Sequence, residues 1–182
     1  MSTQHYVTFN DGAQVPWLAF GTGTALYGQD AAALVEQAIN TGIVHLDGAQ
    51  AYSNEETLGA GIKASGKPRS ELYIVTKLKG DTPIQDIKPS IHASLKKLGT
   101  DYVDLFLVHN PSGHDVRGTL PAVWKMMEEI KSEGLAKSIG VSNYRLEDLK
   151  ITLETAKVVP AVNQVSTSSR LCNRISNGMC YR

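Results

Sequence analysis

Cysteine is scarce in this 182-residue chain, which contains only Cys172 and Cys180, both in its last stretch. Two cysteines cannot build a disulfide framework or paired Cys-x-x-Cys metal motifs. The five histidines also lack the i, i+4 spacing of a helical zinc site. We therefore expect a reducing compartment and no bound metal ion.

An excess of one charge and a long apolar run are also lacking. The 18 basic residues balance the 18 acidic residues, so the sequence predicts no electrostatic attraction to nucleic acid or to an anionic membrane. No apolar run approaches the roughly 20 residues of a spanning helix. The first seven residues have neither the basic nor the apolar region of a secretory signal. The expected location is the cytoplasm.

Apolar runs rich in β-branched residues alternate with segments of helical periodicity, which predicts repeated βαβ units and a parallel sheet. Their near-continuous apolarity is typical of strands covered on both faces. Asn10-Asp11-Gly12 is a strong turn signal and predicts a hairpin over residues 6–15. The six predicted strands cover residues 15–20, 42–47, 71–77, 102–109, 137–141 and 161–165.

Five helices are predicted between these strands. Asp30 and Gly42 delimit the first, whose apolar face contains Ala31, Leu34, Val35, Ala38 and Ile39. The second opens at Ser53-Asn54-Glu55-Glu56, which has the spacing of a capping box. The third runs from Pro89 to Gly99, and the fourth covers residues 119–133. The fifth follows Asn143 and carries a stripe of Leu146, Leu149, Leu153 and Ala156.

The strands recur about every 30 residues, the size of one βα unit. This spacing fits both an eight-unit barrel and an open doubly wound sheet. Polar residues occupy the carboxyl ends of the predicted strands, and in a parallel sheet those ends share one face. In a barrel, that face carries the active site. The polar residues are Asp47, Lys77, His109, Ser142, Asn143 and Gln164.

Tyr52 follows Asp47 by five residues and is a candidate acid. A phenol ordinarily loses its proton only at about pH 10, so it needs a neighbouring cation to act as an acid at neutral pH. We expect Lys77 to supply that cation and Asp47 to hold the ammonium group. His109 would orient the same substrate oxygen.

Two motifs imitate other dehydrogenases. Gly21-Thr22-Gly23 resembles the start of a dinucleotide-binding fingerprint, but Leu26 occupies the place of the third glycine. Tyr73 and Lys77 have the Tyr-x-x-x-Lys spacing of short-chain dehydrogenases. They lie in a predicted strand, where the two side chains are too far apart for that partnership.

Four segments together resemble the aldo-keto reductase family. They are Leu-Asp-Gly-Ala-Gln-Ala-Tyr-Ser-Asn-Glu at 46–55, Thr-Lys at 76–77, Leu-Gly-Thr-Asp-Tyr-Val-Asp-Leu-Phe-Leu-Val-His at 98–109, and Gly-Leu-Ala-Lys-Ser-Ile-Gly-Val-Ser-Asn-Tyr at 134–144. The resemblance extends from about Tyr6 to Val165 and implies a (β/α)8 barrel of TIM-barrel type whose bottom is closed by the hairpin. It also implies that Asp47, Tyr52, Lys77 and His109 are the catalytic residues.

The implied activity is NADPH-dependent reduction of an aldehyde or ketone to an alcohol, by reversible hydride transfer with Tyr52 as proton donor. The implied substrate is a small-molecule carbonyl compound, and the implied assembly is a monomer. The substrate pocket would contain Tyr52, His109 and Asn110. The implied contacts to NADP(H) are Gly21, Thr22, Gly23, Asp47, Ser142, Asn143 and Gln164.

Six strands correspond to about six of eight βα units, so the expected α/β fold is an incomplete barrel with exposed, aggregation-prone sheet edges. Residues 1–165 would form this partial barrel. Residues 166–182 show no apolar periodicity and predict an irregular tail outside the family pattern. In the family, the part that grips the adenosine 2′-phosphate lies beyond the seventh strand. A non-catalytic fragment or pseudo-enzyme that acts as a binding subunit is therefore the alternative.

Overall fold

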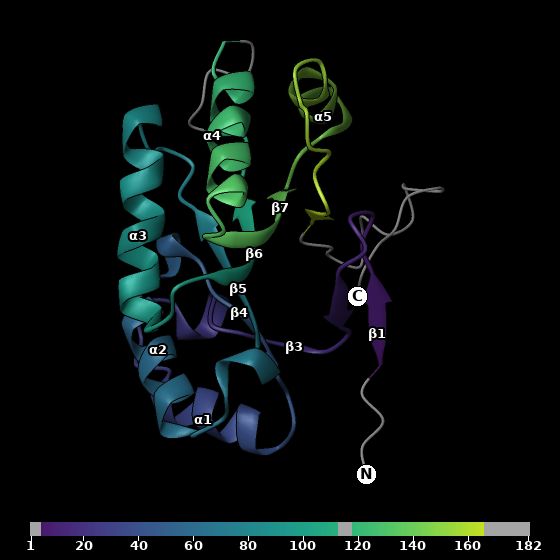
Figure 1. Cartoon of the computed structure of the whole chain (residues 1–182). Helices are drawn as coiled ribbons and strands as arrows, with labels where there is room; N and C mark the ends of the chain where they lie inside the picture. Colours follow the sequence, from purple (N-terminus) through teal and green to yellow (C-terminus); the bar gives the residue numbers. More distant parts are fainter. Residues whose placement is uncertain (1–4, 113–117, 166–182) are drawn as a thin grey trace.

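A computed structural model describes residues 5–112 and 118–165 of the chain. Six parallel strands form one curled sheet in the order β3-β4-β5-β6-β7-β8 (Figure 1). The order follows the chain, so each strand pairs with its predecessor and β3 and β8 lie at the two edges. The α/β prediction of an incomplete barrel is confirmed. The strands are β3 (Ala19–Gly21), β4 (His45–Asp47), β5 (Tyr73–Leu78), β6 (Val103–Val108), β7 (Ala136–Ser142) and β8 (Asn163–Gln164).

The predicted hairpin is confirmed as β1 (Tyr6–Thr8) paired antiparallel with β2 (Gln14–Pro16). Asn10 Nδ2 donates to the Pro160 carbonyl at 2.8 Å and thereby ties the turn to the chain before β8. The single strand predicted over residues 15–20 is wrong. The hairpin strand β2 ends at Pro16, which has no N–H to continue a ladder, and the first barrel strand starts only at Ala19.

In the part of the chain that the structure describes, five α-helices and four short 3₁₀ helices connect the strands. Figure 1 shows α1 to α4 along the outer side of the curled sheet and the hairpin on the opposite side. The main core lies between these helices and the sheet and includes the fully buried Phe106 and Trp124. The helices are α1 (Ala32–Asn40), α2 (Glu55–Ala64), α3 (Ile87–Leu98), α4 (Leu120–Ser132), α5 (Leu146–Leu153), η1 (Thr24–Leu26), η2 (Gln50–Tyr52), η3 (Arg69–Glu71) and η4 (Ile84–Asp86).

The capping box predicted at the start of α2 is wrong. Asn54 is the residue that precedes the helix, and no side-chain cap bond forms there. Its amide Nδ2 donates instead to the carbonyls of Thr22, at 2.8 Å, and Leu26, at 2.7 Å. A tertiary contact has therefore replaced the local cap. The third predicted helix also starts earlier, at Ile87, because Pro89 is tolerated within the first turn.

The leucine stripe predicted for α5 is only partly buried. Leu146 is 69% exposed and Leu153 is 45% exposed, whereas Asp148 and Thr152 are buried. Asp148 accepts a bond from the Arg145 backbone at 2.9 Å and pairs with the Arg145 side chain, which stabilises the start of the helix. Leu149 and Ala156 of the same stripe are half-buried and pack against the main core. Leu34 of α1 is exposed, contrary to the prediction.

The inside of the curled sheet forms a second, smaller core. Val75, Leu105 and Leu107 pack there with Val15 from the hairpin. A cavity of about 440 Å³ adjoins this core, and residues from the hairpin, β3 and β8 line it. In a closed eight-stranded barrel, side chains from all strands fill the interior. Six strands leave part of that space open.

The loop after β3 lies against the segment that carries Tyr52. The Gly28 N–H donates to the Tyr52 carbonyl at 2.8 Å. A Cβ atom on Gly23 would lie 2.9 Å from Cζ of the Tyr52 ring, whereas a Cβ on Gly21 would meet nothing within 4 Å. Neither glycine has a positive φ, so the constraint at Gly23 is the close approach of the ring.

We predict that Gly23→Ala displaces the Tyr52 ring and lowers the free energy of unfolding by about 1–3 kcal/mol, the usual cost of overpacking. Gly21→Ala is the matched control and should change neither quantity appreciably. Chemical denaturation measures the stability, and the aromatic NMR signals of Tyr52 report the ring. Equal effects of the two substitutions would contradict the predicted clash.

The buried side chain of His45 should make the stability of the fold depend on pH. Its Nδ1 lies 2.8 Å from the Pro16 carbonyl oxygen, and its Nε2 is buried without a hydrogen-bond partner. Burial lowers the pKa of His45 below its ordinary 6.5, and Lys77 adds to this effect, although the bond to Pro16 and the charges of Asp47 and Asp104 oppose it. The unfolded chain therefore takes up this proton at a higher pH than the folded chain.

The free energy of unfolding should consequently fall as the pH drops below about 6.5, the unfolded value, towards the folded pKa. His45→Gln keeps a donor for Pro16 but cannot titrate, so its unfolding free energy should decline less steeply with acidification. Urea titrations between about pH 5 and pH 8 test this. An identical slope in the variant would rule out His45 as a source of the effect.

Candidate active site

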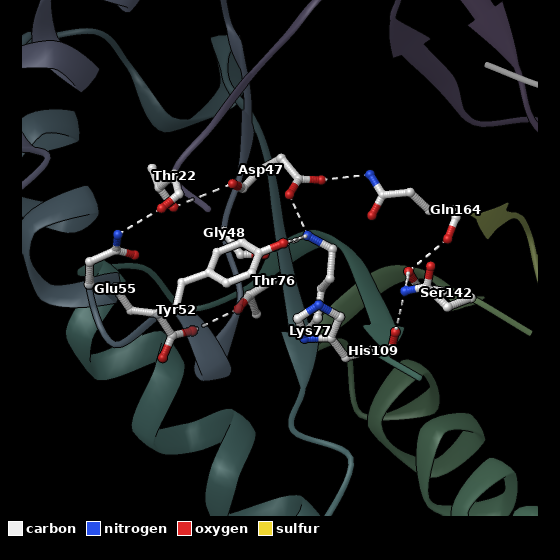
Figure 2. A network of polar contacts seen from close by, with 12 residues as sticks. Thr22, Asp47, Gly48, Tyr52, Glu55, Thr76, Lys77, His109, Ser142 and Gln164 are labelled. Atoms are coloured by element: carbon white, nitrogen blue, oxygen red, sulfur yellow. Dashed lines mark hydrogen bonds and ion pairs between the residues drawn. The ribbon is translucent and has the colours of Figure 1, made fainter. Parts of the chain in front are cut away.

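The four predicted catalytic side chains meet at the carboxyl ends of three adjacent strands (Figure 2). Asp47 ends β4, Lys77 lies next to the end of β5, and His109 follows β6 directly. Tyr52 is the last residue of η2, the 3₁₀ helix after β4. The alternation of side chains along each strand directs Lys77 towards the inside of the sheet.

Lys77 is the centre of the contacts. Its side chain is 2% exposed and forms an ion pair with Asp47 Oδ1. Its Nζ also donates to the Gly48 carbonyl at 2.9 Å and lies 3.4 Å from the Tyr52 hydroxyl. The ammonium thus has three oxygen partners, as a buried Lys requires. Sequence reasoning missed Gly48, because a backbone carbonyl leaves no signal in residue type.

The rings of Tyr52 and His109 meet edge to face, with centroids 5.4 Å apart and an interplanar angle of 81°. His109 Nδ1 is buried without a hydrogen-bond partner. Burial lowers the pKa of His109, and the positive charge of Lys77 lowers it further, while Asp47 acts in the opposite direction. The imidazole is therefore neutral at pH 7 and can donate only one N–H.

Ser142, Asn143 and Gln164 form a chain of polar contacts beside Asp47. Gln164 Nε2 donates to Asp47 Oδ2 at 2.7 Å, and the Ser142 hydroxyl donates to the backbone carbonyl of Gln164 at 2.7 Å. Asn143 Nδ2 lies 3.1 Å from both the His109 carbonyl and Ser142 Oγ. Asn143 has a φ of +59°, a conformation that Asn tolerates better than most residues.

These seven side chains surround one small cavity of about 190 Å³. Four of them are the predicted catalytic residues, and three are predicted cofactor contacts. The structure therefore brings both groups to a single polar site. The lining consists of Asp47, Tyr52, Lys77, His109, Ser142, Asn143, Gln164 and Val165.

Residues 21–23, which the sequence predicts to contact the cofactor, lie next to this cavity. Gly21 is the strand partner of Asp47, and the buried Thr22 donates its N–H to the Asp47 carbonyl at 3.0 Å. Gly23 lies against the Tyr52 ring. Asn110 follows His109, but it does not line the cavity: its Oδ1 accepts a bond from Ser112 at 2.7 Å.

Sequence reasoning also missed the buried polar residues Asn54 and Glu55. Asn54 fixes the loop through Thr22 and Leu26, as described above. Glu55 accepts a bond from Thr76, the residue before Lys77, at 2.7 Å. Both belong to the motif that predicts a capping box, and that local interpretation hides their tertiary contacts.

Metal-binding clusters and membrane-spanning helices were sought among residues 5–112 and 118–165. No three His, Cys, Asp or Glu side chains there are grouped so that they could hold a metal ion. Among the helices of the same residues, none is both long and apolar enough to span a membrane. Cys172, Cys180 and the predicted tail at 166–182 lie outside the described residues.

Known sequences resemble this chain over most of its length. The profile of the Aldo/keto reductase family matches residues 17–180. An NAD/NADP-dependent indole-3-acetaldehyde reductase from Schizosaccharomyces pombe is 37% identical over 162 residues, covering 85% of this chain and 56% of the relative. A glyoxal reductase from Bacillus subtilis is 33% identical over 180 residues, covering 98% of this chain and 64% of the relative.

Solved structures give the same result. An aldo/keto reductase from Brucella melitensis superposes with a TM-score of 0.84 at 37% identity, covering 91% of this chain and 64% of that one. A Bombyx mori aldo-keto reductase in complex with NADP gives a TM-score of 0.82 at 32% identity, covering 92% and 59%. The chain thus spans about three fifths of the length of these relatives. By profile, sequence and structure, it belongs to the aldo/keto reductase family.

Proposed function

We propose that this chain carries the site for reversible reduction of an aldehyde or ketone to an alcohol with NADP(H), and that Tyr52 is the proton donor. The observation that carries the proposal is the contact between the Tyr52 hydroxyl and Lys77 Nζ, 3.4 Å apart, at a cavity that Asp47 and His109 also line. The reductase names of the relatives support the same reaction class.

The proton transfer follows from the contacts of Lys77. When Tyr52 gives its proton to the carbonyl oxygen, a phenolate forms next to the ammonium. The two opposite charges attract each other more strongly than in bulk water because the Lys77 side chain is buried. Asp47 and the Gly48 carbonyl hold the ammonium in place. Lys77 therefore favours the charge that develops on Tyr52 during the transfer.

His109 supplies the second polar contact to the substrate. Its lowered pKa keeps the imidazole neutral at pH 7, so it can donate one hydrogen bond without adding a second cation beside Lys77. Tyr52 and His109 lie against each other at the same cavity. A carbonyl oxygen between them would accept from both, which orients the substrate for protonation.

The residues at the cavity fit a nicotinamide carboxamide. Such a group has both donors and an acceptor, and the Ser142 hydroxyl with the Asn143 and Gln164 amides offers both kinds of partner. We propose that these three residues hold the carboxamide and that Gly21, Thr22, Gly23 and Asp47 also contact the cofactor. NADP(H), when bound, supplies hydride to the carbonyl carbon or removes it from the alcohol. Asn110 would contact the substrate from outside the cavity.

A non-catalytic binding subunit is the second candidate. β3 and β8 each pair with a single strand in the described part of the chain, and unpaired strand edges can accept another strand. The two candidates differ in cofactor binding, which the first requires and the second does not.

We further propose that the protein is a cytoplasmic monomer with a small-molecule substrate and that residues 1–165 form its partial barrel.

NADPH should bind saturably and change its fluorescence on titration with the purified chain. Asn143→Gly removes the carboxamide but retains a residue that tolerates the positive φ. It should weaken binding about tenfold, the effect of losing one hydrogen bond worth about 1.4 kcal/mol. Leu146→Ala, an exposed position nearby, should bind like the unaltered chain. No binding at high NADPH concentration would contradict the reductase proposal and favour the binding subunit.

Tyr52→Phe should reduce the turnover of a generic aromatic aldehyde about 10²- to 10⁴-fold, the usual contribution of a positioned general acid. NADPH binding should remain unchanged, because no cofactor contact is removed. Tyr6→Phe makes the same substitution on the exposed hairpin and serves as the control. Parallel loss of cofactor binding and turnover in Tyr52→Phe would argue against the role of proton donor.

A further inference from the structure

A group of buried polar side chains lies behind the proposed active site. Glu55 is 3% exposed, and Thr76 and Ser94 are also buried. They come from α2, β5 and α3, respectively, and none of them lines the 190 Å³ cavity. A buried carboxylate is costly unless its oxygens are hydrogen-bonded, so the contacts of Glu55 require an explanation.

Both oxygens of Glu55 have partners. Thr76 Oγ1 donates to Oε1 at 2.7 Å, and Ser94 Oγ donates to Oε2 at 3.2 Å. Gln50 Nε2 in turn lies 3.2 Å from Ser94 Oγ. We call Gln50, Glu55, Thr76 and Ser94 the Glu55 cluster. Figure 2 shows the Glu55 carboxylate directed at Thr76 on the strand that also carries Lys77.

The position of Glu55 suits a carboxylate without a cationic partner. Within residues 5–112 and 118–165, no Lys, Arg or His side chain forms an ion pair with Glu55. Glu55 is the first residue of α2, where free backbone N–H groups favour a negative charge. A carboxylate only accepts hydrogen bonds, so both hydroxyl groups must donate to it.

The Glu55–Thr76 bond joins the two segments that supply Tyr52 and Lys77. Thr76 and Lys77 are neighbours in β5, and their side chains leave opposite faces of the sheet. Tyr52 ends η2 three residues before Glu55. The bond therefore fixes, on the outer face of β5, the relative position of two segments whose hydroxyl and ammonium groups meet on the inner face.

Gln50 adds a second connection between the same segments. Its Oε1 accepts a bond from the backbone N–H of Lys79, just beyond β5, at 3.0 Å. Its Nε2 reaches Ser90 and Ser94 of α3. Residues 50–55 are thus attached to β5 at Thr76, to the loop directly after β5 at Lys79, and to α3 through its serines. Tyr52 lies between these attachments.

We propose that Glu55 is a positioning residue for the proton donor, because its bond to Thr76 sets the separation between the Tyr52 hydroxyl and the Lys77 ammonium. The catalytic consequence rests on the proposed function, whereas the effect on Tyr52 can be observed in the ligand-free protein. Thr76→Val keeps the shape of the side chain but removes the hydroxyl. It leaves Glu55 Oε1 without its donor, and the segment carrying Tyr52 can then move away from β5.

The first test follows Tyr52 without cofactor or substrate. The ring signals of ¹³C-labelled tyrosines are recorded for the full chain and assigned to Tyr52 with Tyr52→Phe. Thr76→Val should shift the Tyr52 signals, and Thr76→Ser, which keeps the hydroxyl, should restore them. Glu56→Gln is the matched control, since Glu56 adjoins Glu55 in α2 but is exposed, and it should leave the Tyr52 signals in place.

The second test separates kcat from cofactor binding. Thr76→Val should lower kcat about 10- to 10²-fold, the size of effect expected when a catalytic group is displaced by up to 1 Å. The Kd for NADPH should stay within about twofold, a change of only about 0.4 kcal/mol, because the residues proposed to hold the cofactor are unaltered. Thr76→Ser should recover most of the lost kcat.

The proposal is overturned if the Tyr52 signals of a cooperatively folded Thr76→Val coincide with those of the unaltered chain, or if Thr76→Ser is as impaired as Thr76→Val. Should Thr76→Val fail to fold, Glu55→Gln replaces it, and unchanged Tyr52 signals there overturn the proposal equally. An unaltered chain without turnover would contradict the proposed function. The ring signals would still decide the role of Glu55.

Discussion

The candidate active site depends on one buried ion pair between Lys77 and Asp47. Each residue lies near the end of a different parallel strand, and the ammonium group that joins them also contacts Tyr52 and the Gly48 carbonyl. A buried charge of this kind is tolerated only when all of its partners are in place. Three features hold these partners in place: the curl of the sheet, the loop after β3 and the Glu55 cluster.

The order of the strands explains how the partners come together. Because β3 to β8 are parallel and follow one another in the sheet, their carboxyl ends lie on one side of it, and residues distant in the chain meet there. Asp47 at the end of β4 accepts a hydrogen bond from Gln164 of β8 and forms an ion pair with Lys77 of the neighbouring strand β5. The parallel topology therefore assembles the polar site. The hydrogen bond between Gln164 and Asp47 spans the open interior of the six-stranded sheet.

Strand-end residues such as Lys77 and His109 could be predicted from the sequence, because polar residues that interrupt apolar runs stand out. Contacts made by the backbone, such as the Gly48 carbonyl, and by buried polar residues such as Glu55 could not. The stripe of α5 is only half covered, with Leu146 and Leu153 exposed, because periodicity predicts an apolar face but not whether another element covers it. The capping box that residues 53–56 predict does not form, because the tertiary contacts of Asn54 outweigh a local capping preference.

The most direct measurement is the single-turnover rate of NADPH oxidation by Lys77→Met, with cofactor and aromatic aldehyde both saturating. If the buried ammonium stabilises the charge that develops on Tyr52, the variant should bind NADPH yet reduce the aldehyde at least about 10²-fold more slowly. A folded Lys77→Met chain that reduces the aldehyde at the rate of the unaltered chain would contradict the central role of this ion pair.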